Sequence, residues 1–168
     1  LGEVGARSAG LRGAPRRFSG SYEAPRRAAG VFPVVSWLND RPAPVYLEGW
    51  RLTVRGAAER EIVLGYEDLA PDSALTATID CTGGWYSTQE GRGGALGRLL
   101  DLAGPLPNAA SVTVTFITGY YRGFSLAGAR NYVLATHVGG RGLSHGHGYP
   151  LRLAAPGKRG FEWVKWVE

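Results

Sequence analysis

At 168 residues the chain fits a single domain. Its 44% hydrophobic content, with five Trp, eight Tyr and five Phe, is enough for a packed core and excludes a chain that is disordered throughout. The formal net charge of +5 is concentrated near the N-terminus, because residues 1–30 hold six arginines against two glutamates. The rest of the chain is nearly neutral, so we expect no nucleic-acid partner.

The composition also predicts the domain organisation. Residues 1–30 are rich in Gly, Ala and Arg and predict a basic, irregular, solvated arm, whereas residues 31–168 carry the apolar pattern of a folded domain. No stretch of 18 or more apolar residues is present, so no membrane span is expected, and residues 1–30 lack the apolar segment of a secretory signal. A single cysteine excludes an internal disulfide.

The first half of the domain predicts strands. Residues 50–55 alternate apolar and polar side chains, and residues 61–64 follow after a polar gap, which predicts an antiparallel pair. Residues 66–69 predict a short helical turn. The Thr-rich segment 75–80 predicts a strand that carries Cys81 at its end, where a Gly-Gly loop begins.

The second half mixes helices and strands. Apolar residues at helical spacing predict a helix over 95–103. We further expect strands at 112–117, 132–138, 151–153 and 161–167, a short helix at 126–130, and a turn at 156–160. Because helices and strands do not alternate regularly, the predicted class is α+β, with mainly antiparallel sheets and short helices.

Cys81 is the first candidate for chemistry. A lone cysteine is often only a small buried apolar residue. Here it ends a strand, precedes a loop that lets a ligand approach the backbone at Gly83, and is followed by an aromatic wall that begins at Trp85. A soft thiolate in such a mouth suits a transition metal or nucleophilic catalysis. A cysteine hydrolase would also need a base, for which the sequence offers His137, His145 and His147.

The second candidate is the Gly-rich segment 144–152 (SHGHGYPLR), which is followed by Lys158, Arg159 and Lys165. Its two histidines suggest zinc only weakly, because further ligands at the usual spacing are missing. Backbone N–H groups interleaved with cations better match an anion site.

Together these motifs resemble the sulfite oxidase superfamily, and in particular its oxidoreductase molybdopterin-binding domain. The pattern of residues 147–152 (HGYPLR), with 156–160 (PGKRG) and 164–166 (VKW), resembles the molybdopterin-binding signature of that family. Residues 80–85 (DCTGGW) resemble the segment that carries its molybdenum-ligating cysteine, and the likeness extends over roughly residues 31–167.

The resemblance implies a molybdenum–molybdopterin cofactor and a role for each matching residue. Cys81 would be the catalytic residue and the protein ligand to molybdenum. His147, Arg152 and Lys165 would bind the pterin or its phosphate. Gly83 and Trp85 would lie beside the cofactor.

The resemblance also implies an activity and partners. We expect a two-electron oxygen-atom transfer on a small oxyanion or sulfoxide. The chain resembles the short bacterial enzymes more closely than the animal sulfite oxidases. These bacterial enzymes, such as the periplasmic methionine sulfoxide reductase catalytic subunit, use a haem-bearing membrane partner for electron transfer. A periplasmic or extracytoplasmic location follows from that likeness alone.

One departure motivates an alternative. Relatives carry a Trp-x-Gly-Val type segment before the helix, whereas this chain has Gly91 and Gly94 there, which predicts a looser loop beside the cofactor. A non-catalytic descendant that serves as a binding or structural module is therefore a second hypothesis. The cysteine hydrolase is a third.

Overall fold

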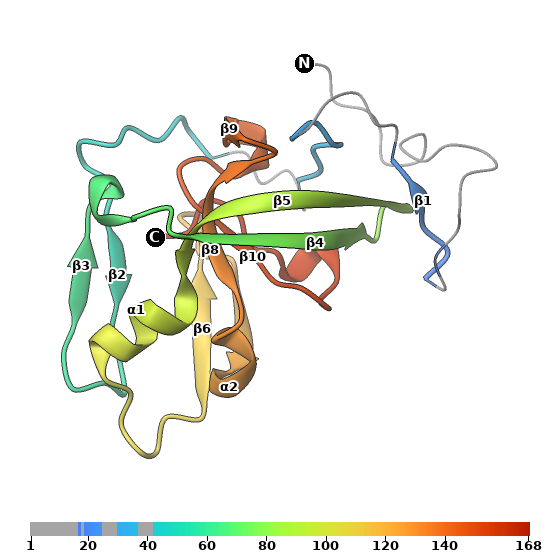
Figure 1. Ribbon diagram of the computed structural model, residues 1–168. Coiled ribbons are helices and arrows are strands. Elements are labelled where there is room, and N and C mark those ends of the chain that lie inside the picture. The colour runs from blue at the N-terminus through green and yellow to red at the C-terminus, as the bar shows by residue number, and fades with distance from the viewer. Residues whose placement is uncertain (1–16, 18, 25–29, 37–41) are drawn as a thin grey trace.

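The computed structural model describes residues 17, 19–24, 30–36 and 42–168. Apart from the parallel pair β1–β5, its strand pairs are antiparallel, and its helices are short, so the predicted α+β class is confirmed (Figure 1). The elements are β1 (Tyr22–Glu23), β2 (Leu52–Val54), β3 (Ile62–Leu64), β4 (Ser73–Cys81), β5 (Trp85–Ala95), α1 (Leu96–Ala103), β6 (Ser111–Thr115), β7 (Tyr121–Ser125), α2 (Leu126–Ala129), β8 (Val133–Val138), β9 (Arg141–Gly142) and β10 (Arg152–Ala154), with 3₁₀ turns at Tyr66–Asp68, His145–His147 and Gly160–Glu162.

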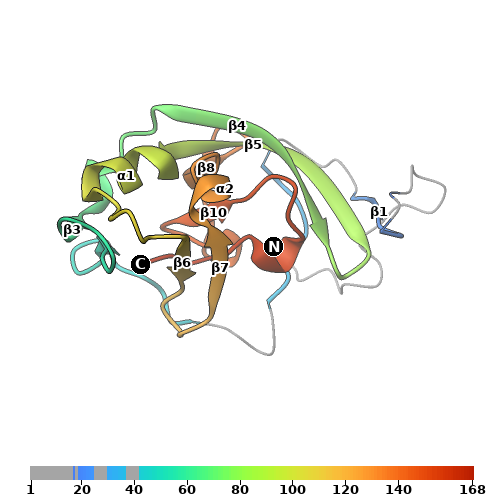
Figure 2. The ribbon, with the colours of Figure 1, turned by 90° about the horizontal axis from the view of Figure 1, so that it is seen from below.

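The main sheet is built around a long hairpin of β4 and β5. Its strand order is β1-β5-β8-β10, with β4 paired to β5 and β9 paired to β8. The hairpin runs from the pair Ser73–Gly93 to the pair Cys81–Trp85 at its tip. Figure 1 shows the hairpin extending toward β1, and Figure 2 shows it curving around β8 and β10. The hairpin therefore carries Cys81 to the end of the sheet.

Two smaller sheets and helix α1 complete the core. The predicted pair at 50–55 and 61–64 is confirmed as β2 and β3, and β6 pairs with β7. The helix predicted over 95–103 is confirmed as α1, which ends at Gly104 in the left-handed conformation. Its four residues at helical spacing are buried, namely Leu96, Leu99, Leu100 and Ala103.

The predicted loop at residues 91–94 is wrong, because these residues lie inside β5. Gly91 pairs with Leu75 and Val138, and the sheet register shifts between Arg92 and Gly93, which marks a bulge. A Cβ atom on Gly93 would lie 1.9 Å from the carbonyl oxygen of Leu134. Gly93 thus allows close strand approach, whereas a Cβ on Gly91 or Gly94 would meet only ordinary contacts. The segment lies in a strand and not in a loop.

The predicted strand at 161–167 is also wrong. The segment begins in the 3₁₀ turn Gly160–Glu162 and continues irregularly, with Leu153 N–H donating to the Val164 carbonyl at 2.8 Å and Val167 N–H donating to the Leu151 carbonyl at 3.0 Å. Phe161 is exposed, and the apolar residues of 163–167 are buried without forming a regular ladder. Strand β7 was not predicted, because its residues 121–125 (YRGFS) lack a clear alternation.

Part of the predicted irregular arm is ordered against the sheet. Strand β1 pairs in parallel with the start of β5, and Ser21 is only 1% exposed. The rest of the arm, residues 1–16, 18 and 25–29, lies outside the described residues. Within the described part of the chain, no helix is both long and apolar enough to cross a membrane.

The bulge in β5 yields a stability prediction. Gly93→Ala places a Cβ against backbone atoms, so we expect a loss of about 2 kcal/mol in the free energy of unfolding. Gly123→Ala, in β7, is the matched control because its Cβ meets nothing within 4 Å. Urea denaturation of both variants measures the difference, and equal stabilities would contradict the assignment of the bulge.

Candidate functional site

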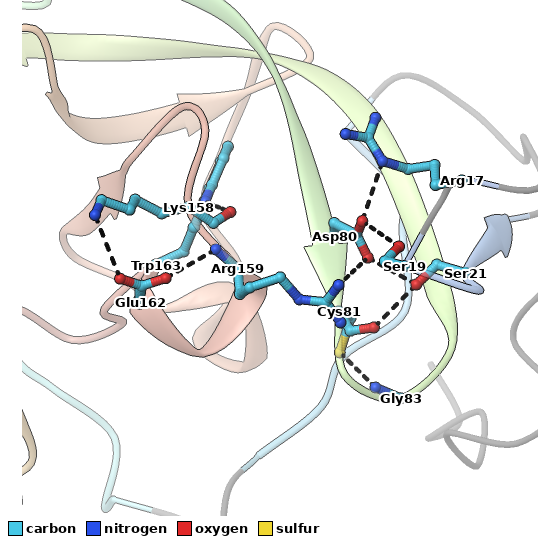
Figure 3. Close-up of polar contacts among 10 residues, drawn as sticks. All are labelled: Arg17, Ser19, Ser21, Asp80, Cys81, Gly83, Lys158, Arg159, Glu162 and Trp163. Carbon is cyan, nitrogen blue, oxygen red and sulfur yellow. Dashed lines mark hydrogen bonds and ion pairs between the residues drawn. The ribbon is translucent and has the colours of Figure 1, made fainter.

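Cys81 closes the tip of the β4–β5 hairpin, as predicted for a cysteine at the end of a strand. The turn is tight, since Gly84 N–H donates to the Cys81 carbonyl at 3.1 Å and Gly84 has a φ of +86°. Gly83 N–H points to the Cys81 Sγ at 3.4 Å (Figure 3). Trp85, the pairing partner of Cys81, is buried and packs 6.1 Å from the ring of Phe32.

Groups around the Cys81 thiol shift its pKa in opposite directions. Burial raises the pKa of Cys81, and the charge of Asp80 adds to this effect, while the Gly83 N–H and the cations Arg152 and Arg159 lower it. The net pKa is above its ordinary value, so the thiol by itself is protonated at neutral pH. A soft metal displaces that proton on binding.

No histidine among the described residues hydrogen bonds to the Cys81 thiol. His145 Nε2 contacts the Pro42 carbonyl at 3.0 Å, and the ring nitrogens of His147 are both occupied elsewhere. His137 contacts Thr136. The cysteine hydrolase hypothesis therefore lacks its base.

The C-terminal motif lies beside the Cys81 thiol, although about 80 residues separate them in sequence. Residues 159–160 lie against the end of β4, so that a Cβ on Gly160 would be 3.1 Å from the Cα of Cys81. Cys81 and Lys165 line one pocket with Tyr120, Phe161 and Trp163. The Cys81 segment and the C-terminal segment, which both resemble motifs of the family, thus lie close together.

Arg152 is a buried cation beside the thiol. Its guanidinium lies 5.6 Å from the centre of the Phe32 ring and 5.9 Å from that of Trp163, and its NH1 donates to the His147 carbonyl at 3.2 Å. Burial lowers its pKa to about 10, while Cys81 acts in the opposite direction, so Arg152 stays charged at neutral pH. Its Nε has no partner, and no carboxylate among the described residues pairs with it.

His147 and Lys165 are anchored by the protein. His147 Nε2 lies 3.0 Å from the Phe32 carbonyl and Nδ1 lies 2.8 Å from Ser144 Oγ, an arrangement that satisfies a neutral ring. Burial lowers the pKa of His147 to about 4, helped by the charges of Arg152 and Lys165 and opposed by the bond to Phe32. Lys165 Nζ donates to the carbonyls of residues 35 and 146 and lies over the Trp166 ring at 4.2 Å.

Sequence reasoning missed a second cluster next to the thiol. Asp80 precedes Cys81 in β4 and accepts hydrogen bonds from Arg17, Ser19 and Ser21, and it forms an ion pair with Arg159 (Figure 3). The one available signal was a carboxylate at an inward-facing strand position, which requires partners when buried. Its partners are about 60 to 80 residues away in sequence, so no local pattern reveals them.

Neither of two other possible sites carries the predicted chemistry. Among the residues that the structure describes, no group of three or more His, Cys, Asp or Glu side chains is arranged to hold a metal ion, so the zinc alternative has no support. A larger groove lies between β2, α1 and β6, but none of the predicted site residues lines it.

The residues present fit a molybdenum–molybdopterin cofactor. The cofactor combines a metal that accepts a soft sulfur ligand with an anionic phosphate, and the site offers one thiol beside an unpaired buried cation. Trp85 Nε1 is another buried donor that has no partner in the part of the chain that the structure describes.

Comparisons with known proteins agree with this fit. The chain is 28% identical over 167 residues to the nitrate reductase [NADPH] of Mycosarcoma maydis, covering 72% of this chain and 17% of the relative. It is 27% identical over 173 residues to the sulfite oxidase of Arabidopsis thaliana, covering 77% of this chain and 44% of the relative. The chain thus spans less than half the length of these relatives.

A solved structure and a family model complete the comparison. The sulfane dehydrogenase SoxCD from Paracoccus pantotrophus is similar in fold, with a TM-score of 0.70 and 25% identity over 87% of this chain and 42% of that chain. Residues 40–168 match the model of the oxidoreductase molybdopterin binding domain. The chain therefore belongs to the oxidoreductase molybdopterin-binding domain family of the sulfite oxidase superfamily, whose cofactor is molybdenum–molybdopterin.

Proposed function

We propose that this domain is a molybdopterin-dependent oxidoreductase that uses the Cys81 sulfur as its protein ligand to molybdenum. The observation that carries the proposal is the buried Arg152 guanidinium, which lies beside the chain's only thiol and has no carboxylate partner among the described residues. A buried charge without a counter-ion is costly, and an anionic group bound next to it offsets that cost. The cofactor's phosphate or pterin oxygens are the anions that this family supplies.

The other predicted residues would act around this pair. Gly83 N–H would continue to donate to the ligating sulfur, which disperses its negative charge. His147 would act by holding Phe32 and Ser144 together with a neutral ring, since both of its nitrogens are already bonded. Lys165 would contribute positive charge at the pocket, and the buried Trp85 would support Cys81, its pairing partner at the hairpin tip.

The substrate proposed is a small oxyanion or a sulfoxide. When bound, the cofactor supplies two-electron oxygen-atom transfer. In the oxidising direction one water provides the oxygen atom, and two protons and two electrons leave; the reducing direction is the reverse. The chain's contribution is a mouth with the cations Lys165 and Arg159 near Cys81, which favours oxygen-rich anions.

The electrons would pass to a separate redox partner. A haem-bearing membrane protein and a periplasmic or extracytoplasmic location are the partner and compartment that we propose, by likeness to the short bacterial enzymes. The second hypothesis, a non-catalytic descendant that serves as a binding or structural module, was motivated by Gly91 and Gly94, which lie within β5. Protein purified without pterin fluorescence despite an adequate cofactor supply would favour it.

Metal content tests the proposal directly. We expect protein produced with an adequate cofactor supply to contain about one molybdenum per chain, because Cys81 and Arg152 hold the metal and the anion. Cys81→Ser should lose most of the molybdenum and the activity. A Cys81→Ser variant that retained both would contradict the proposal.

Arg152 gives a prediction that does not depend on activity. Arg152→Met removes a buried, unpaired charge, so we expect the metal-free variant to be at least as stable as metal-free wild type while its cofactor content falls severalfold. Urea denaturation and pterin fluorescence measure the two effects. Arg98→Met, at an exposed ion pair, is the control and should change neither. A destabilised variant with full cofactor would contradict the role of Arg152.

His147 predicts a pH dependence of stability. Its folded pKa of about 4 lies below the ordinary value of 6.5, so between those values the unfolded state binds a proton that the folded state does not. We expect the free energy of unfolding of the metal-free protein to fall by about 2 kcal/mol from pH 7.5 to pH 5 through this residue. Denaturation of His147→Gln at both pH values isolates the effect, and an equal fall in the variant would refute it.

A further inference from the structure

Asp80 is the centre of a polar cluster that joins three distant parts of the chain. Its buried carboxylate accepts Arg17 Nε at 3.0 Å, Ser19 Oγ at 2.7 Å and Ser21 Oγ at 2.7 Å. Arg159 NH1 approaches the same carboxylate at 3.4 Å from the C-terminal motif. Figure 3 shows these side chains converging on the end of β4.

The N-terminal residues also hold the backbone on the far side of the Cys81 turn. Tyr22 N–H donates to the Gly84 carbonyl at 3.0 Å, and Ala24 N–H donates to the Tyr86 carbonyl at 2.8 Å. We call Arg17 and residues 19–24 the N-terminal strap. The strap therefore bonds to residues on both flanks of the turn at residues 82–84.

The contacts with the strap keep the Asp80 carboxylate ionised. Burial would raise the pKa of Asp80, but the hydroxyls of Ser19 and Ser21 and the charges of Arg159 and Arg17 outweigh it and hold the pKa below its ordinary value. The carboxylate is thus ionised and needs its donors. Without the strap, Arg159 at 3.4 Å is the only one of the four described side-chain partners that would remain.

The strap lies outside the residues that the family model matches. The family model covers residues 40–168, whereas the strap ends at Ala24. Its contacts nevertheless concentrate on the residues that surround the thiol, including Ser21 Oγ at 3.4 Å from the Cys81 carbonyl.

We propose that the N-terminal strap is a positioning element of the Cys81 centre: by bonding to Asp80, Gly84 and Tyr86 it keeps the turn closed, limits access to the thiol and fixes the direction of the sulfur. The part of this inference that concerns metal ligation rests on the proposed function. The part that concerns the turn does not.

The single cysteine makes the closed state measurable. In metal-free protein, the rate of alkylation by iodoacetamide reports only on Cys81. Ser19→Ala/Ser21→Ala removes two hydrogen bonds and leaves every charge in place, so we expect the alkylation rate to rise between about fivefold and about thirtyfold. Arg17→Gln, at a side chain that is partly exposed, should raise it about fivefold.

Two control variants match these changes elsewhere in the fold. Ser125→Ala removes the hydroxyl that caps α2, and Arg130→Gln breaks the 2.7 Å pair with Asp101. Both should leave the alkylation rate within twofold of wild type. Recording rates over a pH series separates a change in access, which alters the plateau rate, from a change in thiol acidity, which moves the midpoint.

Two results would contradict a role of the strap in closing the turn. Strap variants with plateau rates within twofold of wild type, or control variants that rise equally, would overturn it. If the double serine variant loses global stability, two other measurements test the inference. These are the alkylation rate of Arg17→Gln and the hydrogen exchange rate of the Gly83 and Gly84 amides, which should be faster only in variants that weaken the strap.

Metal retention connects the strap to the proposed function. In molybdenum-loaded protein, the strap variants should lose metal several times faster than the control variants on gel filtration. Wild-type protein that never contains molybdenum would reject the proposed function alone, because the alkylation result stands without it. Loaded strap variants that retain metal as wild type does would overturn the link between strap and ligation.

Discussion

The site depends on one uncompensated charge in the protein interior. Arg152 is held between aromatic rings and a single carbonyl, with no carboxylate among the described residues to neutralise it. Folding alone gains little from such an arrangement, since a buried cation without an anion opposes stability. In the function proposed for this domain, an anionic ligand would supply the counter-charge that the described part of the chain lacks.

Asp80, which precedes Cys81 in β4, shows the opposite arrangement. This carboxylate is neutralised within the chain, by two hydroxyls and two guanidinium groups. The buried charges of Asp80 and Arg152 thus both lie near Cys81, but they do not form an ion pair with each other. The two charges therefore differ in their partners: Asp80 joins chain segments, whereas Arg152 has no carboxylate partner among the described residues.

The sequence predicted features that local pattern determines. Helix α1 followed from the spacing of its apolar residues, and the place of Cys81 followed from a β-branched strand before a Gly-Gly turn. The glycines at 91–94 misled the interpretation, because glycine marks a loop by composition and a bulge only when the opposing strand is known. The Asp80 cluster was beyond prediction, since it requires pairing of β1 with a strand about 60 residues away.

The bulge at Gly93 lies at the base of the long hairpin, and Cys81 lies at its tip. Eight positions separate Gly93 from Trp85, the partner of Cys81, which corresponds to roughly 26 Å of extended chain. A rotation of about 5° at the base would move the tip by roughly 2 Å, whereas metal–ligand distances tolerate about 0.2 Å. The backbone geometry at Gly93 therefore helps to set the position of the Cys81 sulfur.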